Sequence, residues 1–353
     1  TTMHRASRLL AAALGVAALT LTACGTTDVK TEASSAPASA ESTSCAADTT
    51  KTSTEPVKMT DSLGRTVELD KPAERIVVLE WQQTEDLLTL CVTPVGASDI
   101  EGYGTYVSAE KLPASVKDVG ERGEPDLDTL YGLNPDLIVV ESAGADDELL
   151  KTLEKRDVPV LATKGADASG QIANMKNVFT MIGEATGRSE RAAQVVSELD
   201  AHLAEAKTKV ADAKLETTDF LFFDGWIEGG NVVIRPYGKG ALFTELGEQL
   251  GLKAAWTDEI NESYGSGGVD PSYGLAQTDI EGLTAVGDAN LIYSNDETAE
   301  SYVTELEKSS IWTALPAVKE GRAHAFPAGV WGAGGPRSNE QAIDAFVDVI
   351  QGK

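Results

Sequence analysis

The chain has 353 residues, of which 42% are hydrophobic and 24% are charged, as in ordinary soluble globular proteins. This length favours two domains over a single core. The formal net charge of -27 argues against nucleic acid and against an anionic membrane surface as partners, since both would be repelled. It says little about a small ligand, which responds to local charge.

The first 23 residues have the pattern of an export signal. A short basic segment precedes an apolar run at residues 9–21, which is too short to be a stable membrane-spanning anchor. The run leads into LTAC at residues 21–24, which resembles the lipobox of bacterial lipoproteins, where the cysteine becomes the lipidated first residue. We expect residues 1–23 to be removed and Cys24 to anchor the protein on the extracytoplasmic face of the cell membrane. A signal peptide with an incidental cysteine is the alternative.

Residues 24–55 consist largely of Thr, Ser, Ala and acidic residues, almost without large apolar side chains. Such a segment cannot bury enough surface to fold, so we expect a disordered tether. Two more cysteines follow, Cys45 and Cys91. An exported pair can form a disulfide, but the sequence cannot show whether these two meet in space. No histidine pattern accompanies either cysteine, which argues against a catalytic thiol.

The folded part begins with a predicted hairpin, after which helices and strands alternate. Residues 137–140, LIVV, are apolar on both faces, as in a strand covered by helices on either side. The alternation favours a parallel sheet with helices on both faces, and we assign residues 56–188 to an N-terminal α/β lobe. The hairpin is predicted at residues 56–69, further strands at 75–79, 93–97, 137–140 and 158–161, and helices at 84–91, 125–134, 148–156 and 172–185.

A longer helix is predicted at residues 189–213, where apolar side chains recur at three- and four-residue steps. At 1.5 Å per residue it would reach about 37 Å, the width of a domain, and would join two lobes. The alternation restarts beyond it, so residues 214–353 form a C-terminal α/β lobe. The predicted fold class is α/β, with two Rossmann-like lobes of parallel-rich sheets and a single long α-helix between them. The strands are predicted at 220–223, 231–234 and 290–293, and the helices at 241–250 and 279–286.

The residue patterns of common catalytic and metal sites are missing from the sequence. Its three histidines, His4, His202 and His324, lie far apart in the chain, whereas a bare transition metal needs two or three converging imidazoles or thiolates. No serine elbow, zinc-protease pair or phosphate-binding loop occurs. We interpret the glycine-rich stretches 265–268 and 332–335 as flexible loops. We expect no enzyme, no metal site and no cofactor.

Aromatic and arginine side chains gather instead near strand ends and in loops. The carboxyl ends of parallel strands are where α/β sheets bind ligands. Aromatic rings with a few guanidinium groups suit a bulky, partly apolar ligand that exposes oxygen acceptors or negative charge. For any one of them, a core aromatic or a surface arginine is the plainer alternative. The candidate ligand-binding residues are Trp81, Tyr103, Tyr106, Arg122, Trp226, Arg235, Tyr237, Tyr273, Trp331 and Arg337.

Each lobe also has a carboxylate in the first turn of a helix that leads to a central strand. These are Asp128 and Glu281. Complementing the helix dipole explains an acid at either site taken alone. Its recurrence in both lobes suggests a shared use.

Several segments together resemble iron-siderophore binding proteins of ABC importers, and among these the ferric-hydroxamate binders. The likeness runs in order from about Val57 to the C-terminus. It implies two α/β lobes bridged by one long helix, a shallow ligand cleft between them and only small closure. The segments are DSLGRTVELDKPAERIVVLEW, EDLLTLCVTPVGASDIEGYGTYV, DVGERGEPDLDTLYGLNPDLIVVES, ALFTELGEQLGLKAAW and IWTALPAVKEGRAHAFPAGVW.

The resemblance also implies roles for particular residues. In the hydroxamate binders an arginine in the DVG-x-R segment, here Arg122, hydrogen-bonds the iron-bound hydroxamate oxygens. Trp81, Tyr106 and Tyr273 fall where that family has aromatic walls. Proteins of this kind dock on arginines of their permease through one acid on each lobe, and Asp128 and Glu281 match those positions.

One departure from the family concerns the siderophore class. The tyrosine that bonds hydroxamate in the family would fall near Ala145. Its loss, with Arg235 and Arg337 present, leaves room for a carboxylate-bearing ligand such as ferric citrate.

The sequence therefore predicts a monomeric, lipid-anchored receptor that captures a ferric siderophore and hands it to an ABC permease in the cytoplasmic membrane. Iron would arrive already chelated. Cobalamin or haem binding on the same fold is the alternative, and an exported enzyme is the alternative from another class, against which the missing nucleophile and base count.

Overall fold

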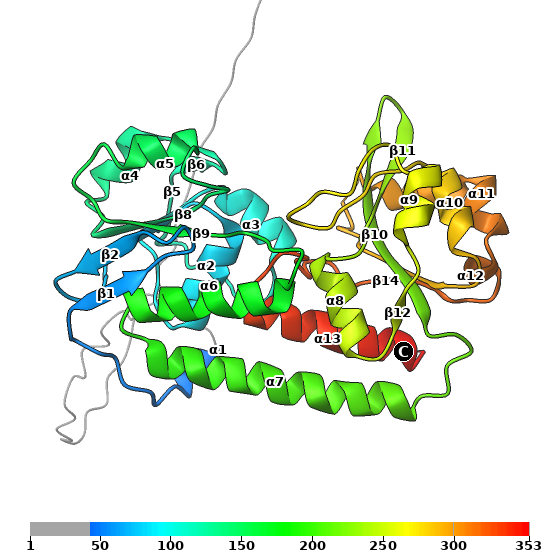
Figure 1. Ribbon diagram of the computed structural model, residues 1–353, viewed down its shortest axis with the longest axis horizontal. Coiled ribbons are helices and arrows are strands. Elements are labelled where there is room, and N and C mark those ends of the chain that lie inside the picture. The colour runs from blue at the N-terminus through cyan, green and yellow to red at the C-terminus, as the bar shows by residue number, and fades with distance from the viewer. Residues whose placement is uncertain (1–42, 299, 353) are drawn as a thin grey trace, which may run out of the picture. The chain divides into compact units, whose positions relative to one another are not determined.

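The computed structural model describes residues 43–298 and 300–352. The predicted signal segment, Cys24 and the tether as far as residue 42 lie outside the described residues. Two separate five-stranded sheets organise the described chain, one built before α7 and one after it (Figure 1). We call these sheets, with their helices, the N-terminal and C-terminal lobes. None of the helices in residues 43–298 and 300–352 is long and apolar enough to span a membrane.

The N-terminal lobe has an all-parallel sheet in the order β5-β4-β3-β8-β9, preceded by an antiparallel hairpin. Residues 137–140 of β8 are fully buried and alternate between two hydrophobic clusters, because helices cover both faces of the sheet. The hairpin is β1 (Val57–Thr60) and β2 (Thr66–Leu69), and the sheet is β3 (Ile76–Val78), β4 (Gly96–Ala97), β5 (Lys117–Asp118), β8 (Leu137–Glu141) and β9 (Val160–Thr163). The helices are α2 (Trp81–Thr89), α3 (Ile100–Tyr106), α4 (Leu127–Gly132), α5 (Glu148–Leu153) and α6 (Gln171–Ala185).

Two details of this lobe differ from the sequence prediction. Helix α2 begins at Trp81, three residues early, because the Glu80 side chain accepts the Trp81 N–H and caps the helix. The predicted helix start at Pro125 is also wrong. There a short hairpin of β6 (Gly120–Glu121) and β7 (Glu124–Pro125) forms, whose turn contains Arg122 and Gly123 at φ 80°.

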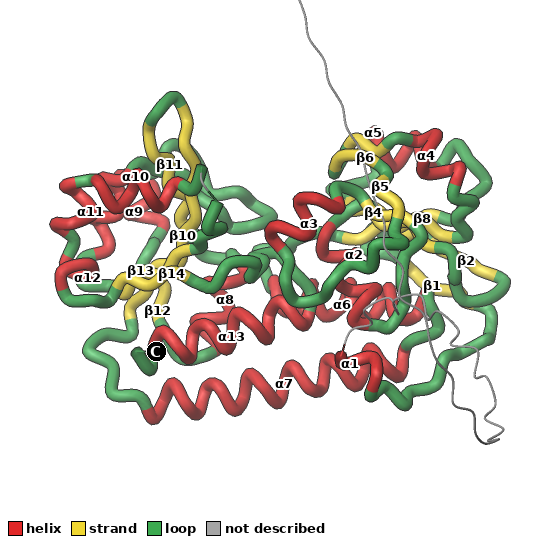
Figure 2. Tube along the Cα trace, turned by 180° about the vertical axis from the view of Figure 1, so that it is seen from behind, coloured by secondary structure: helices red, strands yellow, loops and turns green. Residues whose placement is uncertain are grey.

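Helix α7 (Ser189–Asp212) ends one residue before the predicted limit. Its buried stripe contributes Ala192 and Val195 to the core of the N-terminal lobe, and Leu199, Ala206 and Val210 to that of the C-terminal lobe. One amphipathic face therefore belongs to both cores. Helix α13 (Pro336–Ile350) lies alongside α7 (Figures 1 and 2) and also contacts α2 and α6, so the joint is more than a single helix.

The C-terminal lobe has the strand order β11-β10-β13-β14, with β12 pairing the start of β10. Only β11 is antiparallel to its neighbour; it returns from β10 through Gly229 and Gly230, both at positive φ. The strands are β10 (Asp219–Glu228), β11 (Asn231–Pro236), β12 (Lys253–Ala254), β13 (Asn290–Tyr293) and β14 (Ala323–Ala325). The helices are α8 (Leu242–Gln249), α9 (Asp258–Tyr264), the 3₁₀ helix η1 (Ile280–Val286), α10 (Tyr302–Lys308), α11 (Ser310–Ala314), α12 (Pro316–Lys319) and α13.

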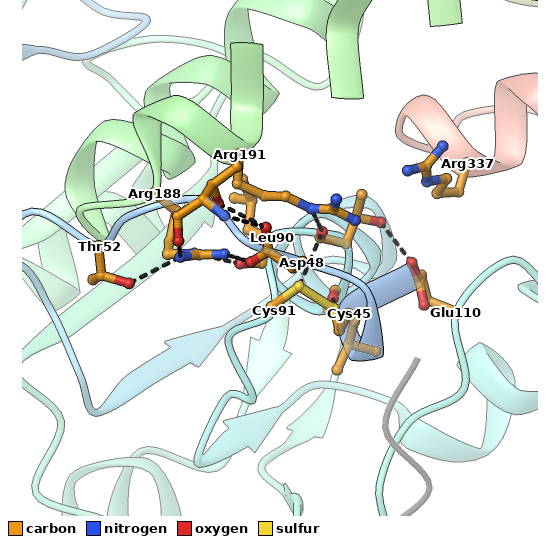
Figure 3. Close-up of a disulfide and its surroundings, with 12 residues drawn as sticks. Cys45, Asp48, Thr52, Leu90, Cys91, Glu110, Arg188, Arg191 and Arg337 are labelled. Atoms are coloured by element: carbon orange, nitrogen blue, oxygen red, sulfur yellow. Dashed lines mark hydrogen bonds and ion pairs between the residues drawn. A yellow bond between two sulfur atoms is a disulfide. The ribbon is translucent and has the colours of Figure 1, made fainter. Parts of the chain in front are cut away.

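The segment before the first hairpin is held on the N-terminal lobe (Figure 3). Cys45, in α1 (Thr43–Ala46), forms a disulfide with Cys91, with 5.5 Å between their Cα atoms. The buried Arg188 donates to the Thr52 hydroxyl (2.8 Å) and the Leu90 carbonyl (2.9 Å) and pairs with Asp48. The prediction of a disordered tether up to residue 55 is therefore wrong for residues 45–53, because a disulfide and a buried charge hold a segment that lacks apolar side chains.

Candidate ligand-binding cleft

A cleft between the lobes consists of two adjoining cavities. The first chamber, about 350 Å³, lies at the carboxyl ends of β3, β8 and β9 and faces the C-terminal lobe. The second chamber, about 310 Å³, adjoins it. Glu80, Glu141 and Tyr273 line only the first, and Trp81, Tyr106, Asp224, Trp226 and Asp296 line only the second. The two share Arg122, Arg235, Tyr237, Trp331 and Gly332.

An aromatic cluster joins the lobes at the second chamber. Trp81 stacks on Tyr106 with 5.5 Å between ring centroids and meets Trp331 edge to face at 4.9 Å. Trp81 is 4% exposed and its indole N–H donates to the Asp99 carbonyl (3.1 Å), whereas Tyr106 is 39% exposed. Trp81 thus provides a fixed apolar surface, and Tyr106 an accessible one.

The guanidinium group of Arg122 lies 4.0 Å from the centre of the Trp81 ring. Its Nε–H donates to both carboxylate oxygens of Glu80, at 3.0 and 2.9 Å. Within the described parts of the chain, the two terminal NH₂ groups of Arg122 make no hydrogen bond. Arg122 can therefore donate to ligand oxygens while Glu80 balances its charge.

Arg235, at the end of β11, is bonded more completely. Its Nε and one NH₂ group donate to the two oxygens of Asp224, at 2.7 and 2.5 Å, in a bidentate pair. The Tyr237 hydroxyl donates to the same carboxylate at 3.1 Å. Burial holds the pKa of Tyr237 well above its usual value, so the phenol stays a donor.

Glu141, the last residue of β8, lies across the cleft from Tyr273. The Tyr273 hydroxyl donates to Glu141 Oε1 at 2.7 Å, which links the two lobes. Burial and the nearby Glu80 raise the pKa of Glu141 to about 6, against the Tyr273 hydrogen bond and Arg122. The Glu141 carboxylate lies over Gly165, where a Cβ atom would come within 2.1 Å of it. Any larger residue at position 165 would displace the carboxylate.

The sequence matches the periplasmic binding protein family over residues 76–328, well over half of the chain. The chain belongs to this family. It is 26% identical over 280 residues to the iron(3+)-hydroxamate-binding protein FhuD of Escherichia coli (strain K12), covering 79% of this chain and 88% of FhuD. The match confirms the prediction that the chain is a member of a substrate-binding protein family. Proteins of this family bind their substrates and are not enzymes.

Solved structures agree with the two-lobed α/β fold of this periplasmic binding protein. FhuD from Vibrio cholerae, a siderophore binding protein solved with Fe3+-Desferal, aligns with a TM-score of 0.64 and 25% identity, over 78% of this chain and 97% of that one. FeuA from Bacillus subtilis, a triscatecholate siderophore binding protein, aligns with a TM-score of 0.62 and 23% identity, over 84% and 98%. The latter shows the shared fold alone.

Eight of the ten candidate residues line the cleft, but Tyr103 and Arg337 do not. Tyr103 is 1% exposed and its hydroxyl donates to the Glu110 carbonyl at 2.7 Å, in the hydrophobic cluster that contains Trp81. Arg337 pairs with Glu198 of α7 and Glu340 of α13, at 2.7 Å each. Tyr103 therefore supports the cleft wall from behind, and Arg337 fixes α13 on α7.

Sequence reasoning missed the acids of the cleft. Glu80 and Glu141 each follow an IVV triplet, in IVVLE and IVVE, on β3 and β8, which are neighbouring parallel strands. The repeated acid at adjacent strand ends was the available signal. The expectation of a flexible loop at residues 332–335 is also wrong, because Gly335 donates its N–H to the buried Glu85 at 3.2 Å and a Cβ there would clash with Asp86.

Asp128 and Glu281 are exposed in the first turns of α4 and η1. The helix caps are other residues: Asp126 accepts the Thr129 N–H at 2.9 Å, and Asp279 accepts the Glu281 N–H at 2.9 Å. The two carboxylates are therefore not needed to cap their helices and stay accessible.

Proposed function

We propose that this periplasmic binding protein captures a ferric siderophore outside the cytoplasmic membrane and delivers it to an ABC permease for iron uptake. The observation that carries the proposal is the arrangement of Arg122 in the cleft. Its guanidinium lies over the Trp81 ring, and its two NH₂ groups have no hydrogen-bond partner within residues 43–298 and 300–352. Such donors suit the oxygens of a chelate, and aromatic rings suit its apolar surface. The named ligand of the relative FhuD is of this kind.

We propose further that the folded chain divides into lobes at residues 56–188 and 214–353 around the helix at 189–213. The distribution of the α7 stripe over both cores supports this division. We also propose that the protein acts as a monomer, anchored through Cys24. Replacing Cys24 by serine should release it from the membrane fraction, and unchanged membrane association would contradict the anchor.

Titration of intrinsic tryptophan fluorescence tests the ligand. Trp81 and Trp331 line the cleft, so a bound ferric chelate should quench their emission at stoichiometric concentrations. Ferric hydroxamates, ferric citrate, a ferric catecholate, haem and cobalamin form the ligand panel. Quenching by a ferric chelate supports the proposal, whereas quenching by haem or cobalamin alone, or by none of the panel, contradicts it.

Permease docking has a matched control in the chain. Replacing Asp128 by Asn together with Glu281 by Gln should abolish iron uptake and leave ligand affinity unchanged, because both carboxylates are exposed and not needed as caps. Glu148 and Glu259 are also first-turn acids, on α5 and α9, one in each lobe. The double change Glu148→Gln and Glu259→Gln should preserve uptake. Equal loss in both double variants, or loss of affinity in the first, would contradict docking through Asp128 and Glu281.

A further inference from the structure

The charged side chains of the cleft carry more negative than positive charge. Its lining contains two guanidinium groups, Arg122 and Arg235, and four carboxylates, Glu80, Glu141, Asp224 and Asp296. Arg122 is bonded to Glu80 and Arg235 to Asp224, so neither arginine adds net positive charge to the cleft. The arginines therefore act as hydrogen-bond donors in a surrounding that is neutral or acidic.

Glu141 is the acid best placed to act on a ligand. It faces the first chamber, and the groups around it are the Tyr273 hydroxyl, Glu80 and Arg122. Tyr273 bonds only Oε1, and Oε2 makes no hydrogen bond to any residue in the described ranges. Arg122 gives its bonds to Glu80. Glu141 is thus a carboxylate at the chamber wall without an arginine bonded to it.

Ferric chelates differ in charge in a way that this arrangement can discriminate. Three hydroxamates neutralise iron(III), three catecholates leave a complex of three negative charges, and citrate complexes are anionic. An anion in the first chamber would be repelled by Glu141 in a partly desolvated site. A neutral complex could accept hydrogen bonds from Arg122, and a cationic substituent would find Glu141.

We propose that the cleft selects ferric chelates by charge, favouring neutral and cationic complexes over anionic ones, with Glu141 as the residue that pairs with a cationic substituent. This inference rests on the proposed function and narrows its ligand class. It disfavours the carboxylate-bearing ligand that the sequence left open, because both arginines that suggested this ligand are already paired with acids of the protein. Arg235 is bonded to Asp224. Arg337 is bonded to Glu198 and Glu340.

Two probes that differ by one charge test this selection. The first is the iron(III) complex of a linear trihydroxamate with a terminal primary amine, and the second is the same complex after acetylation of the amine. Ferric dicitrate and a ferric tris-catecholate are the anionic probes. The full chain should bind the amine form most tightly, the acetylated form about tenfold more weakly, and both anionic probes more weakly still.

Glu141→Gln should remove the tenfold preference, so that the amine and acetylated forms bind the variant with equal affinity. Glu259→Gln, which removes one exposed charge on α9, should leave the preference intact. Tyr273→Phe removes the hydrogen bond to Glu141 but not the Glu141 charge, so it should also keep the preference, which separates the effect of the charge from that of the hydrogen bond.

Tighter binding of either anionic probe would overturn the charge selection and leave the proposed function standing. An equal loss for the amine and acetylated forms in Glu141→Gln would assign Glu141 a structural role instead. If none of the four ferric probes binds, the proposed function fails and the inference with it.

Discussion

The two arginines of the cleft differ in how their partner acids hold them. Glu80 bonds Arg122 only through Nε, so both terminal NH₂ groups have no hydrogen-bond partner among the described residues, and the guanidinium lies 4.0 Å from the centre of the Trp81 ring. Asp224 accepts hydrogen bonds from both the Nε and an NH₂ group of Arg235 in a bidentate pair, and it accepts a third from the Tyr237 hydroxyl. Two residues of one type, each at a strand end or turn, therefore have unequal free donors. The position of the acid, and not the arginine, decides which of them can meet a ligand.

The largest expected difference lies in ligand affinity. Arg122→Ala should weaken binding of a neutral ferric trihydroxamate about 100-fold, because charge-assisted hydrogen bonds to the chelate are lost, on the order of 2–3 kcal/mol. Arg235→Ala should change the same affinity less than about threefold, since its Nε–H and one of its NH₂ groups are already bound to Asp224. Isothermal titration calorimetry measures both. Equal losses in the two variants would remove the distinction between the arginines.

Glu141 extends the comparison to an acid without a bonded arginine. Its pKa in the folded protein is about 6 against an ordinary 4.5, so between these values the folded state binds more protons than the unfolded state. Its contribution to the free energy of unfolding is therefore most favourable below pH 4.5 and falls by about 2 kcal/mol as pH rises through 6. The free energy of unfolding, measured with urea from pH 4 to pH 7, should include this decline in the wild type. In Glu141→Gln the total decline over the same range should be smaller by about 2 kcal/mol. An identical decline in the variant would show that Glu141 titrates normally.

Asp224→Asn should convert Arg235 into a free donor with uncompensated charge. We expect affinity for ferric dicitrate to rise about tenfold, because a guanidinium in a partly buried cleft attracts a carboxylate. The same panel of fluorescence titrations measures it. Asp296→Asn is the control, because Asp296 lies in the same chamber and receives its hydrogen bonds from Thr298 instead of an arginine. A similar rise in affinity for ferric dicitrate in both variants would mean that the loss of any negative charge in the chamber is sufficient, and would contradict a specific role for Arg235.

The smallest expected effect concerns the rings under the arginines. The Arg122 guanidinium lies 4.0 Å from the Trp81 ring, and that of Arg235 lies 5.7 Å from the Trp226 ring. Trp81→Phe should weaken binding of the neutral chelate about threefold to fivefold, whereas Trp226→Phe should leave it within about twofold. Calorimetry with the two variants decides, and a larger loss for Trp226 would contradict the assignment of the ligand to Arg122.

Much of the fold could be predicted because burial leaves a periodic pattern. The double-faced apolar run in β8 and the long stripe of α7 both follow from which faces are covered. The start of α2 was placed late because the Glu80 cap is a single side-chain contact, which no periodicity records. The fixed segment at residues 45–53 was missed for a similar reason, since a disulfide and Arg188 hold it without apolar burial.

The site was only partly predictable, because side-chain direction depends on tertiary partners. Residue type and position at strand ends found Trp81, Arg122, Tyr273 and Trp331. The same reasoning included Tyr103, whose ring turns into the core. It does not find Glu80 and Glu141, because only the pairing of β3 with β8 brings these two strand ends side by side.

The central claim is that Arg122 meets an iron-bound oxygen in this cleft. A crystal structure of the protein with a neutral ferric trihydroxamate, with the iron located by its anomalous scattering, tests it most directly. We predict iron between the lobes and a hydroxamate oxygen within about 3.2 Å of a terminal nitrogen of Arg122. Iron outside the two chambers, or a bound chelate that Arg122 does not contact, would contradict the account.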